Sequence, residues 1–456
     1  MATYREEKDT MGVVRVPADA YYGAQTQRAV DNIPIGGIRM PTGFVRALAL
    51  IKRCGAEVNR RLGLLEPRLA EAVVSAAREV LAGRLDDQFP VGVFQTGSGT
   101  SSNMNLNEVI ASRANEILTG RKGGKSPVHP NDHVNLGQSS NDAVPSAIHI
   151  AALTAIHGRL IPALRRLHRA LAGKAAEFAD VRKIGRTHLQ DAVPMTLGQE
   201  FSGYARQVEL AVERVLAVEP RLAELALGGT AVGTGVNAHP DFAAETIALI
   251  ARETGIGFRR ADNPFEAQAA RDAAVEASAA LKTLAVSLTK IANDLRWLGS
   301  GPRCGLGEIA LPSLQPGSSI MPGKVNPVVP EAVLQVAAQV IGNDATVTIA
   351  AQSGSFELNV MMPVIAYNLL QSVDLLAAAA EVLAEKCIEG IRADREACAA
   401  FIERSLALAT GLVPRIGYDR AAAVAQRAYA SGRTVRAVLI EEKILPMEEI
   451  DTLLNI

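Results

Sequence analysis

Apolar residues recur every three or four positions over most of the chain, which is the spacing of helices that bury one face. The clearest case is residues 265–298, where an apolar a/d seam continues to the end of the segment. The seam consists of Leu281, Leu284, Leu288, Ile291, Leu295 and Leu298. If the segment forms one helix, it is roughly 50 Å long at about 1.5 Å per residue. Because its other faces are small and rich in alanine, it needs neighbours on several sides, which predicts contacts with other subunits as well.

The same periodicity predicts helix for most of the remaining chain. Helices are expected at 42–62, 67–83, 105–118, 330–350 and 356–388, with shorter ones after residue 390. Long helices are also expected from residue 142 to residue 298, with breaks at 182–194 and 228–241. A short strand is expected at 13–17. The pattern therefore predicts a mainly α protein.

Composition narrows the class of protein. The 456 residues exceed one ordinary core, so two or three domains are expected. The chain is 48% hydrophobic with a net charge of −1, which predicts a globular protein and gives no electrostatic signal for binding nucleic acid or an anionic membrane. Only 4% of the residues are aromatic, which favours helices over a β-sandwich.

The cysteines and the N-terminus bear on cofactors and location. The four cysteines are Cys54, Cys304, Cys387 and Cys398. They form no Cys-x-x-Cys pair, so neither a zinc nor an iron–sulfur cage of cysteines is expected, and they read as reduced thiols of a cytoplasmic protein. Residues 1–9 are charged and lack an apolar core, so no signal peptide is expected. The apolar stretch 277–298 carries charged residues, which predicts a buried core helix and no membrane span.

Four polar loops interrupt the helical chain, and loops on a rigid scaffold are where functional residues concentrate. The richest is 317–327, where Ser318 and Ser319 precede a Met-Pro-Gly breaker, and Lys324 and Asn326 follow. Lysine offers a compact positive charge and asparagine two amide donors, and both suit a carboxylate. The loop leads into a predicted helix N-terminus, which favours anions. The alternative is an ordinary Gly/Pro surface connector, which the ordered polar set disfavours.

The other three loops are rich in hydroxyl, amide or imidazole groups. Residues 96–103 combine glycines and hydroxyls that suit a carboxylate or phosphate, although they lack the third glycine of a dinucleotide fingerprint. Residues 129–142 hold two histidines at zincin-like spacing, but a proline and no glutamate lies between the two, so no metal site is expected. The serines that follow in this loop suit a helix cap. Residues 185–191 hold His188, which is structural in most such loops but gains basicity if an acid such as Glu331 pairs with it.

These loops resemble the signatures of the fumarase/aspartase superfamily, and from about Arg5 to the C-terminus the chain is similar to class II fumarases. The matching segments are Tyr22-Gly-Ala-Gln-Thr-Gln-Arg28, Thr96-Gly-Ser-Gly-Thr100, Gln138-Ser-Ser-Asn-Asp142, Gly185-Arg-Thr-His188 and Gly317-Ser-Ser-Ile-Met-Pro-Gly-Lys-Val-Asn-Pro327. The resemblance implies a mixed, mostly helical domain at 1–138, a central long-helix bundle at 139–390 and a small helical domain at 391–456. It also implies a homotetramer with a twenty-helix core, active sites each built by three subunits, and no metal or organic cofactor.

The resemblance further implies a role for each polar residue. Ser318 is the base that takes a proton from the substrate, His188 activates the water, and Glu331 orients His188. The residues implied to contact substrate are Ser98, Thr100, Ser139, Ser140, Asn141, Thr187, Lys324 and Asn326. His129, Asn131 and Asp132 match a secondary anion pocket. An arginine often completes that pocket in the family, and Ser126 stands there in this chain, beside Lys125.

The implied activity is the reversible hydration of fumarate to L-malate, a small dicarboxylate, by anti addition of water through an aci-carboxylate intermediate. Aspartate ammonia-lyase is the nearest alternative, because it shares the chemistry, and residues 190–195 and 328–331 resemble its sequence. Residues 96–100, Ser140 and residues 227–235 instead favour the fumarase. A non-enzymatic helical scaffold is a further alternative, which predicts a damaged signature loop or the loss of His188, and neither is seen.

Overall fold

In the computed structural model, which describes residues 3–454, the chain is mainly α, as predicted. Residues 1–2 and 455–456, the outermost parts of the first and third predicted domains, lie outside the described range. The chain divides into two compact units. Unit 1 comprises Met1–Pro162, Glu213–Ala285 and Ala338–Ala377, and unit 2 comprises Ala163–Val212, Val286–Ala337 and Ala378–Ile456. The division into three domains stays a prediction.

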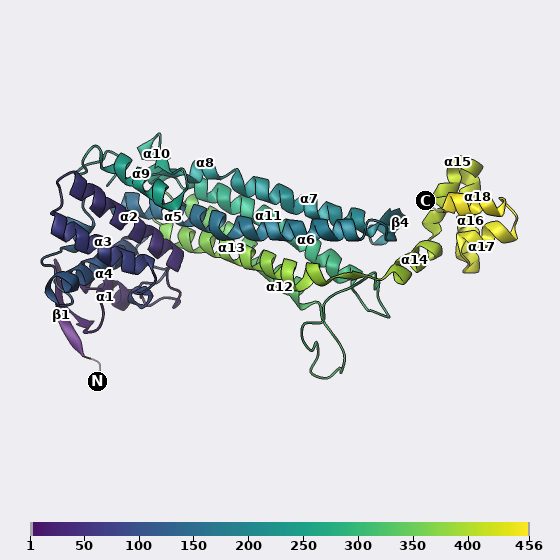
Figure 1. Cartoon of the computed structure of the whole chain (residues 1–456), viewed down its shortest axis with the longest axis horizontal. Coiled ribbons are helices and arrows are strands. Elements are labelled where there is room, and N and C mark those ends of the chain that lie inside the picture. Colours follow the sequence, from purple (N-terminus) through teal and green to yellow (C-terminus); the bar gives the residue numbers. More distant parts are fainter. Residues whose placement is uncertain (1–2, 455–456) are drawn as a thin grey trace. The chain divides into compact units, whose positions relative to one another are not determined.

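Unit 1 contains four neighbouring helices that carry much of its core (Figure 1). They are α2 (Thr42–Arg61), α3 (Pro67–Leu81), α4 (Thr100–Thr119) and α5 (Ser140–Ala155). The first two have the predicted bounds to within two residues, and α3 begins with a proline at its first helical position, where no N–H is needed. Helix α4 begins five residues before the predicted start, because Gly99 takes a left-handed conformation (φ 74°) and the helix follows it at once.

Smaller elements complete unit 1. The helical ones are α1 (Ala24–Asn32), η1 (Asp86–Gln88), η2 (Pro130–Val134), η3 (Ile156–Leu160), α8 (Glu219–Leu222), α9 (Phe242–Thr254) and α10 (Pro264–Ala269). The strands are β1 (Tyr4–Asp9), β2 (Gly12–Pro17), β5 (Glu224–Leu225) and β6 (Arg259–Arg260). Strand β2 is the predicted strand at 13–17, and it pairs antiparallel with β1.

Each of the five boundaries between the units falls within a long helix. These helices are α6 (Ile161–Glu177), α7 (Leu197–Leu216), α11 (Asp272–Leu298), α12 (Val328–Ala351) and α13 (Met362–Val382). All six residues of the predicted a/d seam on α11 are buried, which confirms that this face belongs to the core.

The single helix predicted for 265–298 is wrong, because the chain breaks at Ala270 and Arg271, between α10 and α11. Ala270 is extended (φ −88°, ψ 155°). The Arg271 guanidinium turns inward, and its Nη2 donates to the carbonyl oxygens of Ala267 and Gln268 at 2.6 and 2.7 Å. These bonds satisfy the last carbonyl groups of α10 and so end that helix.

Unit 2 holds an antiparallel hairpin of β3 (Arg182–Thr187) and β4 (Gln190–Thr196), where the sequence pattern predicted only a break. Its other elements are β7 (Ile309–Ala310), η4 (Leu383–Cys387), η5 (Ile388–Gly390), β8 (Arg392–Ala393), α14 (Arg395–Arg404), η6 (Leu406–Leu412), α15 (Val413–Ile416), α16 (Tyr418–Ser431), α17 (Val435–Glu441) and α18 (Met447–Leu454). The elements from η6 to α18 share a small core of their own and gather near the C-terminus in Figure 1. Strand β3 packs against α14 and strand β4 against η6, so the hairpin has a fixed base.

Two helical segments, Ser140–Glu177 and Met362–Gly390, are long and apolar enough by composition to cross a membrane. A bent pair, Arg395–Arg404 with Leu406–Ile416, would be a third if it were one span. In the first two segments, 61% and 67% of the apolar window is buried inside the protein. Burial among other helices accounts for this hydropathy, because helices with several packed faces are apolar nearly all round.

Candidate active site

The first polar loop ends at the N-terminus of α4, where Ser98 and Thr100 are joined by a hydrogen bond of 2.7 Å between their hydroxyl oxygens. The two glycines of this loop allow close approaches to its neighbours. A Cβ on Gly97 would lie 1.6 Å from the carbonyl oxygen of Val360, and one on Gly99 would lie 2.8 Å from a methyl group of Val144 in α5. The loop is therefore held in one shape, with two hydroxyls beside the N-terminus of a helix.

Residues Ser139 to Asp142 cap α5, as predicted. The Ser139 hydroxyl accepts from the backbone N–H of Asn141 at 3.2 Å, and an Asp142 carboxylate oxygen accepts from the backbone N–H of Ser139 at 2.8 Å. The N-termini of α4 and α5 are neighbours, because the Asn103 amide lies 3.4 Å from the Ser140 hydroxyl oxygen. Unit 1 thus brings two positive helix ends and several hydroxyls together, which suits a carboxylate.

Asp142 has a further role that the sequence did not reveal. Its second carboxylate oxygen accepts from the backbone N–H groups of Gly228 and Thr230, at 2.9 and 3.0 Å. Asn141 donates its amide to the carbonyl oxygen of Ala231 at 2.9 Å. Burial raises the pKa of Asp142 to about 6, against the lowering effect of these backbone hydrogen bonds. The segment 228–231 is therefore attached to the start of α5.

The proposed secondary anion residues lie on and beside η2. His129 caps this turn, because its Nδ1 accepts from the backbone N–H groups of Asn131 and Asp132, both at 3.2 Å. The backbone N–H of His129 in turn donates to the His133 ring at 2.8 Å. Asn131 and Asp132 are exposed, and so is Lys125. One ring nitrogen of His129 is thus occupied by the cap.

Thr187 and His188 lie at the tip of the β3–β4 hairpin, where both are exposed. His188 and Leu189 form a two-residue turn with positive φ values of 57° and 59°, although neither is glycine. This conformation fits the twist of a hairpin but costs free energy for side chains with a Cβ, and such strain is common at functional sites.

A buried ionic cluster fixes the base of the same hairpin. The carboxylate of Glu308, which is fully buried, lies 2.9 Å from an Arg186 nitrogen and 3.4 Å from the Lys183 ammonium. Lys183 also pairs with Glu200 at 3.1 Å. Arg186 is two residues before His188, so these ion pairs hold the strand that presents the imidazole.

The signature loop between β7 and α12 has no helix or strand, as predicted (Figure 1). The Ser318 hydroxyl oxygen accepts from the backbone N–H groups of Ile320 and Met321, at 3.2 and 2.9 Å. The Asn326 amide donates to the Gly317 carbonyl oxygen at 2.7 Å, and the Gly317 N–H donates to the Lys324 carbonyl oxygen at 2.8 Å. A Cβ on Gly317 would lie 2.4 Å from that Lys324 oxygen, so the closure of the loop requires glycine.

Lys324 is exposed, and Glu331 lies in the first turn of α12, which begins at Val328, two residues before the expected Pro330. Among the described residues of one chain, no hydrogen bond or ion pair joins His188 to Glu331 or to Ser318. The predicted residues thus fall into two groups. Ser98, Thr100, His129, Asn131, Asp132, Ser139, Ser140 and Asn141 lie in unit 1. Thr187, His188, Ser318, Lys324, Asn326 and Glu331 lie in unit 2.

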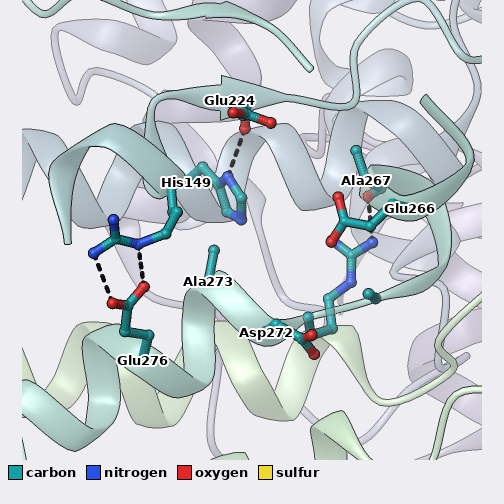
Figure 2. A pocket seen from close by; sticks show the side chains of 10 residues that line it. His149, Glu224, Glu266, Ala267, Asp272, Ala273 and Glu276 are labelled. Carbon is teal, nitrogen blue, oxygen red and sulfur yellow. Dashed lines mark hydrogen bonds and ion pairs between the residues drawn. The ribbon is translucent and has the colours of Figure 1, made fainter. Parts of the chain in front are cut away.

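A pocket of about 340 Å³ in unit 1 contains none of the predicted site residues (Figure 2). The His149 ring donates from Nδ1 to the carbonyl oxygen of Glu224 at 2.8 Å. Burial, together with the nearby Arg271 guanidinium, lowers the pKa of His149 to about 4, so the ring is neutral. Glu266 and Asp272 also line the pocket.

Within residues 3–454, no group of three or more His, Cys, Asp or Glu side chains is placed to hold a metal ion.

Comparison with known proteins identifies the family. A model of the lyase family matches residues 12–342, and a model of the fumarase C C-terminus matches residues 408–456. Fumarate hydratase class II of Thermosynechococcus vestitus is 55% identical over 98% of this chain and 96% of its own length, and that of Mycobacterium tuberculosis is 56% identical over 100% and 96%. The crystal structure of class II fumarase from Schistosoma mansoni superposes with a TM-score of 0.96 at 41% identity, covering 99% of this chain and 98% of that one. The chain therefore belongs to the fumarase/aspartase family of lyases and, within it, to the class II fumarate hydratases.

Proposed function

We propose that this chain catalyses the reversible hydration of fumarate to L-malate, with no metal or organic cofactor. The similar proteins are named fumarate hydratases, after this reaction. One structural observation supports the mechanism that we propose. The Ser318 hydroxyl oxygen accepts two backbone N–H groups. A serine hydroxyl is a poor base unless donors stabilise negative charge on its oxygen, and these two donors do so.

In the dehydration direction, Ser318 removes the proton from C3 of L-malate. The electron pair of the broken C–H bond moves into the neighbouring carboxylate, which becomes an aci-carboxylate dianion. Lys324 supplies a positive charge to this dianion. Asn326 keeps the loop closed through Gly317, and we also assign to it a contact with the substrate carboxylate. Stabilisation that grows as the charge develops lowers the barrier, whereas equal stabilisation of the substrate would not.

We assign the carboxylate contacts to the hydroxyl and amide groups at the two helix ends of unit 1 and to the hairpin tip. These residues are Ser98, Thr100, Ser139, Ser140, Asn141 and Thr187. The N-termini of α4 and α5 support this assignment, because the positive end of a helix dipole favours anions. His129, Asn131 and Asp132 are assigned to a secondary anion pocket, with Lys125 as the nearest cation in the sequence in place of an arginine.

We assign the water step to His188, oriented by Glu331. In dehydration, the imidazolium donates a proton to the C2 hydroxyl as the C2–O bond breaks, and the electrons of the aci-carboxylate form the fumarate double bond. In hydration, the neutral imidazole takes a proton from water as its oxygen attacks C2. The water adds on the face opposite to Ser318, which gives anti addition. The exposed position of His188 at a rigid hairpin tip supports this role.

We further propose a cytoplasmic homotetramer with a twenty-helix core, in which three subunits build each active site and each chain folds as domains 1–138, 139–390 and 391–456. Two observations support shared sites. No hydrogen bond or ion pair joins His188 to Glu331 within the described part of one chain. In addition, the signature loop exposes several large apolar side chains in the single chain, and groups of such side chains are commonly covered by a partner. They are Leu314, Ile320, Met321 and Val325.

The function is tested by identifying products. Purified protein is incubated with fumarate alone and with fumarate plus ammonia, and the products are identified by chromatography. We expect L-malate in both mixtures and aspartate in neither above background. Aspartate formed only with the ammonia would reassign the chain to the ammonia-lyases, and no product in either mixture would support a non-enzymatic scaffold.

A further inference from the structure

A buried lysine bonds the turn that precedes Ser139 and Ser140, two of the residues proposed to bind a carboxylate. Lys52 in α2 is fully buried, and its ammonium donates to the side-chain oxygens of Asn135 at 2.7 Å and Gln138 at 3.0 Å. Among the described residues, no carboxylate lies within ion-pair distance of it. Burial lowers the pKa of Lys52 to about 7, although the charge of Asp142 acts in the opposite direction.

The two acceptors of Lys52, Asn135 and Gln138, are the first and last residues of one turn. The backbone N–H of Gln138 donates to the Asn135 carbonyl oxygen at 3.0 Å. The Asn135 side-chain amide donates back to the Gln138 carbonyl oxygen at 3.0 Å. Lys52 therefore binds both ends of a turn that is already closed on itself. The residue after this turn is Ser139, the cap of α5.

A second connection leads from the same turn to Ser140. The Asn103 amide lies 3.2 Å from the Asn135 side-chain oxygen and 3.4 Å from the Ser140 hydroxyl oxygen. The Asn107 amide also reaches the Asn135 oxygen, at 3.2 Å. A carbonyl oxygen has two lone pairs, so these donors compete for it, and the shortest contact belongs to the charged donor.

The stability of the fold gives no reason for a lysine at this position. A buried ammonium without a carboxylate partner is costly, and an apolar side chain of similar length would fill the space at a lower cost. We infer that Lys52 is a positioning residue that holds the Asn135–Gln138 turn in place. Through this turn it positions the hydroxyls of Ser139 and Ser140 for a substrate carboxylate, an inference that rests on the proposed function.

The first test replaces the lysine and measures KM and kcat separately. Lys52→Met should raise the KM for fumarate about tenfold, the size expected when a charge-assisted hydrogen bond is lost, with kcat changed much less. Lys174→Met is the matched control, because Lys174 is also buried and bonds Glu177 and a backbone carbonyl oxygen, both at 2.8 Å. The control should keep the KM of the wild type. A Lys52→Met enzyme with an unchanged KM would overturn the inference.

A second variant decides the question if Lys52→Met does not fold. Gln138→Met removes one acceptor of the ammonium at a partly exposed position, and it should raise the KM in the same way. Where Lys52→Met does fold, the double variant should be no worse than the worse single variant, because residues that act through one another are not additive. Additive effects, or a normal KM in Gln138→Met, would contradict the positioning role.

A binding measurement separates this inference from the proposed reaction. In the Ser318→Ala background, in which turnover should be about 10²–10⁴-fold slower, a binding titration completed before appreciable turnover gives the Kd directly. Adding Lys52→Met should weaken fumarate binding about tenfold. An unchanged Kd would overturn the role of Lys52 whatever the wild-type enzyme catalyses, whereas a wild-type protein that forms no malate would contradict the proposed function alone.

Discussion

The serine pair in the signature loop provides the sharpest prediction for a single residue. Ser318→Ala should lower kcat by about 10²–10⁴-fold, the usual contribution of a general base, while the KM stays near that of the wild type. The carboxylate-binding groups remain, but the proton acceptor is lost. Steady-state kinetics in both directions measure this effect. Ser319→Ala is the control, and a larger loss of kcat in Ser319→Ala would assign the base to the other serine.

His149 makes a second prediction, about stability and pH. Its folded pKa of about 4 lies below the ordinary value of 6.5, so the unfolded chain binds the proton more tightly. The contribution of His149 to stability is therefore complete above pH 6.5 and is lost as the pH falls from 6.5 through 4. A shift of this size corresponds to about 3 kcal/mol.

His149→Gln should remove this part of the acid sensitivity, since glutamine keeps a donor for the Glu224 carbonyl oxygen but does not titrate (Figure 2). Urea unfolding between pH 4 and pH 6.5, at one protein concentration, measures the slope. The partly exposed His239, replaced by Gln, is the control. An equally steep loss of stability in His149→Gln would show that other groups cause the acid sensitivity.

Single residues were predictable from the sequence only to the level of chemical type. The pattern indicated a carboxylate-binding loop with two serines, but the choice of Ser318 came from the family resemblance. The structure supplies a physical difference, because two backbone N–H groups reach the Ser318 oxygen and, in the described chain, no hydrogen bond to the Ser319 hydroxyl is found. Such bonds depend on loop geometry, which residue types do not encode locally.

Among the elements, the loop before α4 is the most constrained. Gly97→Ala should destabilise the protein by at least about 3 kcal/mol, because its Cβ would lie 1.6 Å from the Val360 carbonyl oxygen and the backbone must move. The displaced Ser98 and Thr100 should also raise the KM for fumarate. Thermal unfolding and kinetics measure both effects. Gly43→Ala, in open space on α2, is the control, and equal stability of the two variants would contradict the packing shown here.

Elements were predictable where a periodic face was long and uninterrupted, as for α2, α3 and the seam of α11. The β3–β4 hairpin was missed because its turn is His188-Leu189 and not an Asn-Gly or Asp-Gly pair. The break before α11 was missed because it depends on the inward turn of Arg271, whose side chain bonds backbone carbonyl groups three and four residues earlier, and the apolar periodicity does not register such a bond. In both places a local feature other than apolar periodicity decides the backbone.

For the whole molecule, we predict a homotetramer. The long helices expose large apolar side chains in the single chain, among them Ile341 and Ile349 on α12, with accessibilities of 41% and 58%. Light scattering should give about four times the 48.1 kDa mass of one chain. Ile341→Asp with Ile349→Asp should dissociate the assembly and abolish activity together. Ile440→Asp on α17 is the control, and a fully active monomer would contradict shared active sites.

The mainly α class was predictable because composition and periodicity agree along the whole chain. The assembly of the site was not, because its polar loops lie in two units and no local pattern in the sequence relates them. Full-length similarity shows the family, whereas the shared active sites that the resemblance implies stay a prediction.

The most direct test of the central claim follows the ultraviolet absorbance of the fumarate double bond with L-malate or L-aspartate as the starting compound. Both compounds give the same product, so one signal compares the two leaving groups at one site. If His188 and Glu331 serve the loss of water, absorbance should rise from L-malate and stay at background from L-aspartate. Absorbance that rises from L-aspartate and stays flat with L-malate would contradict it.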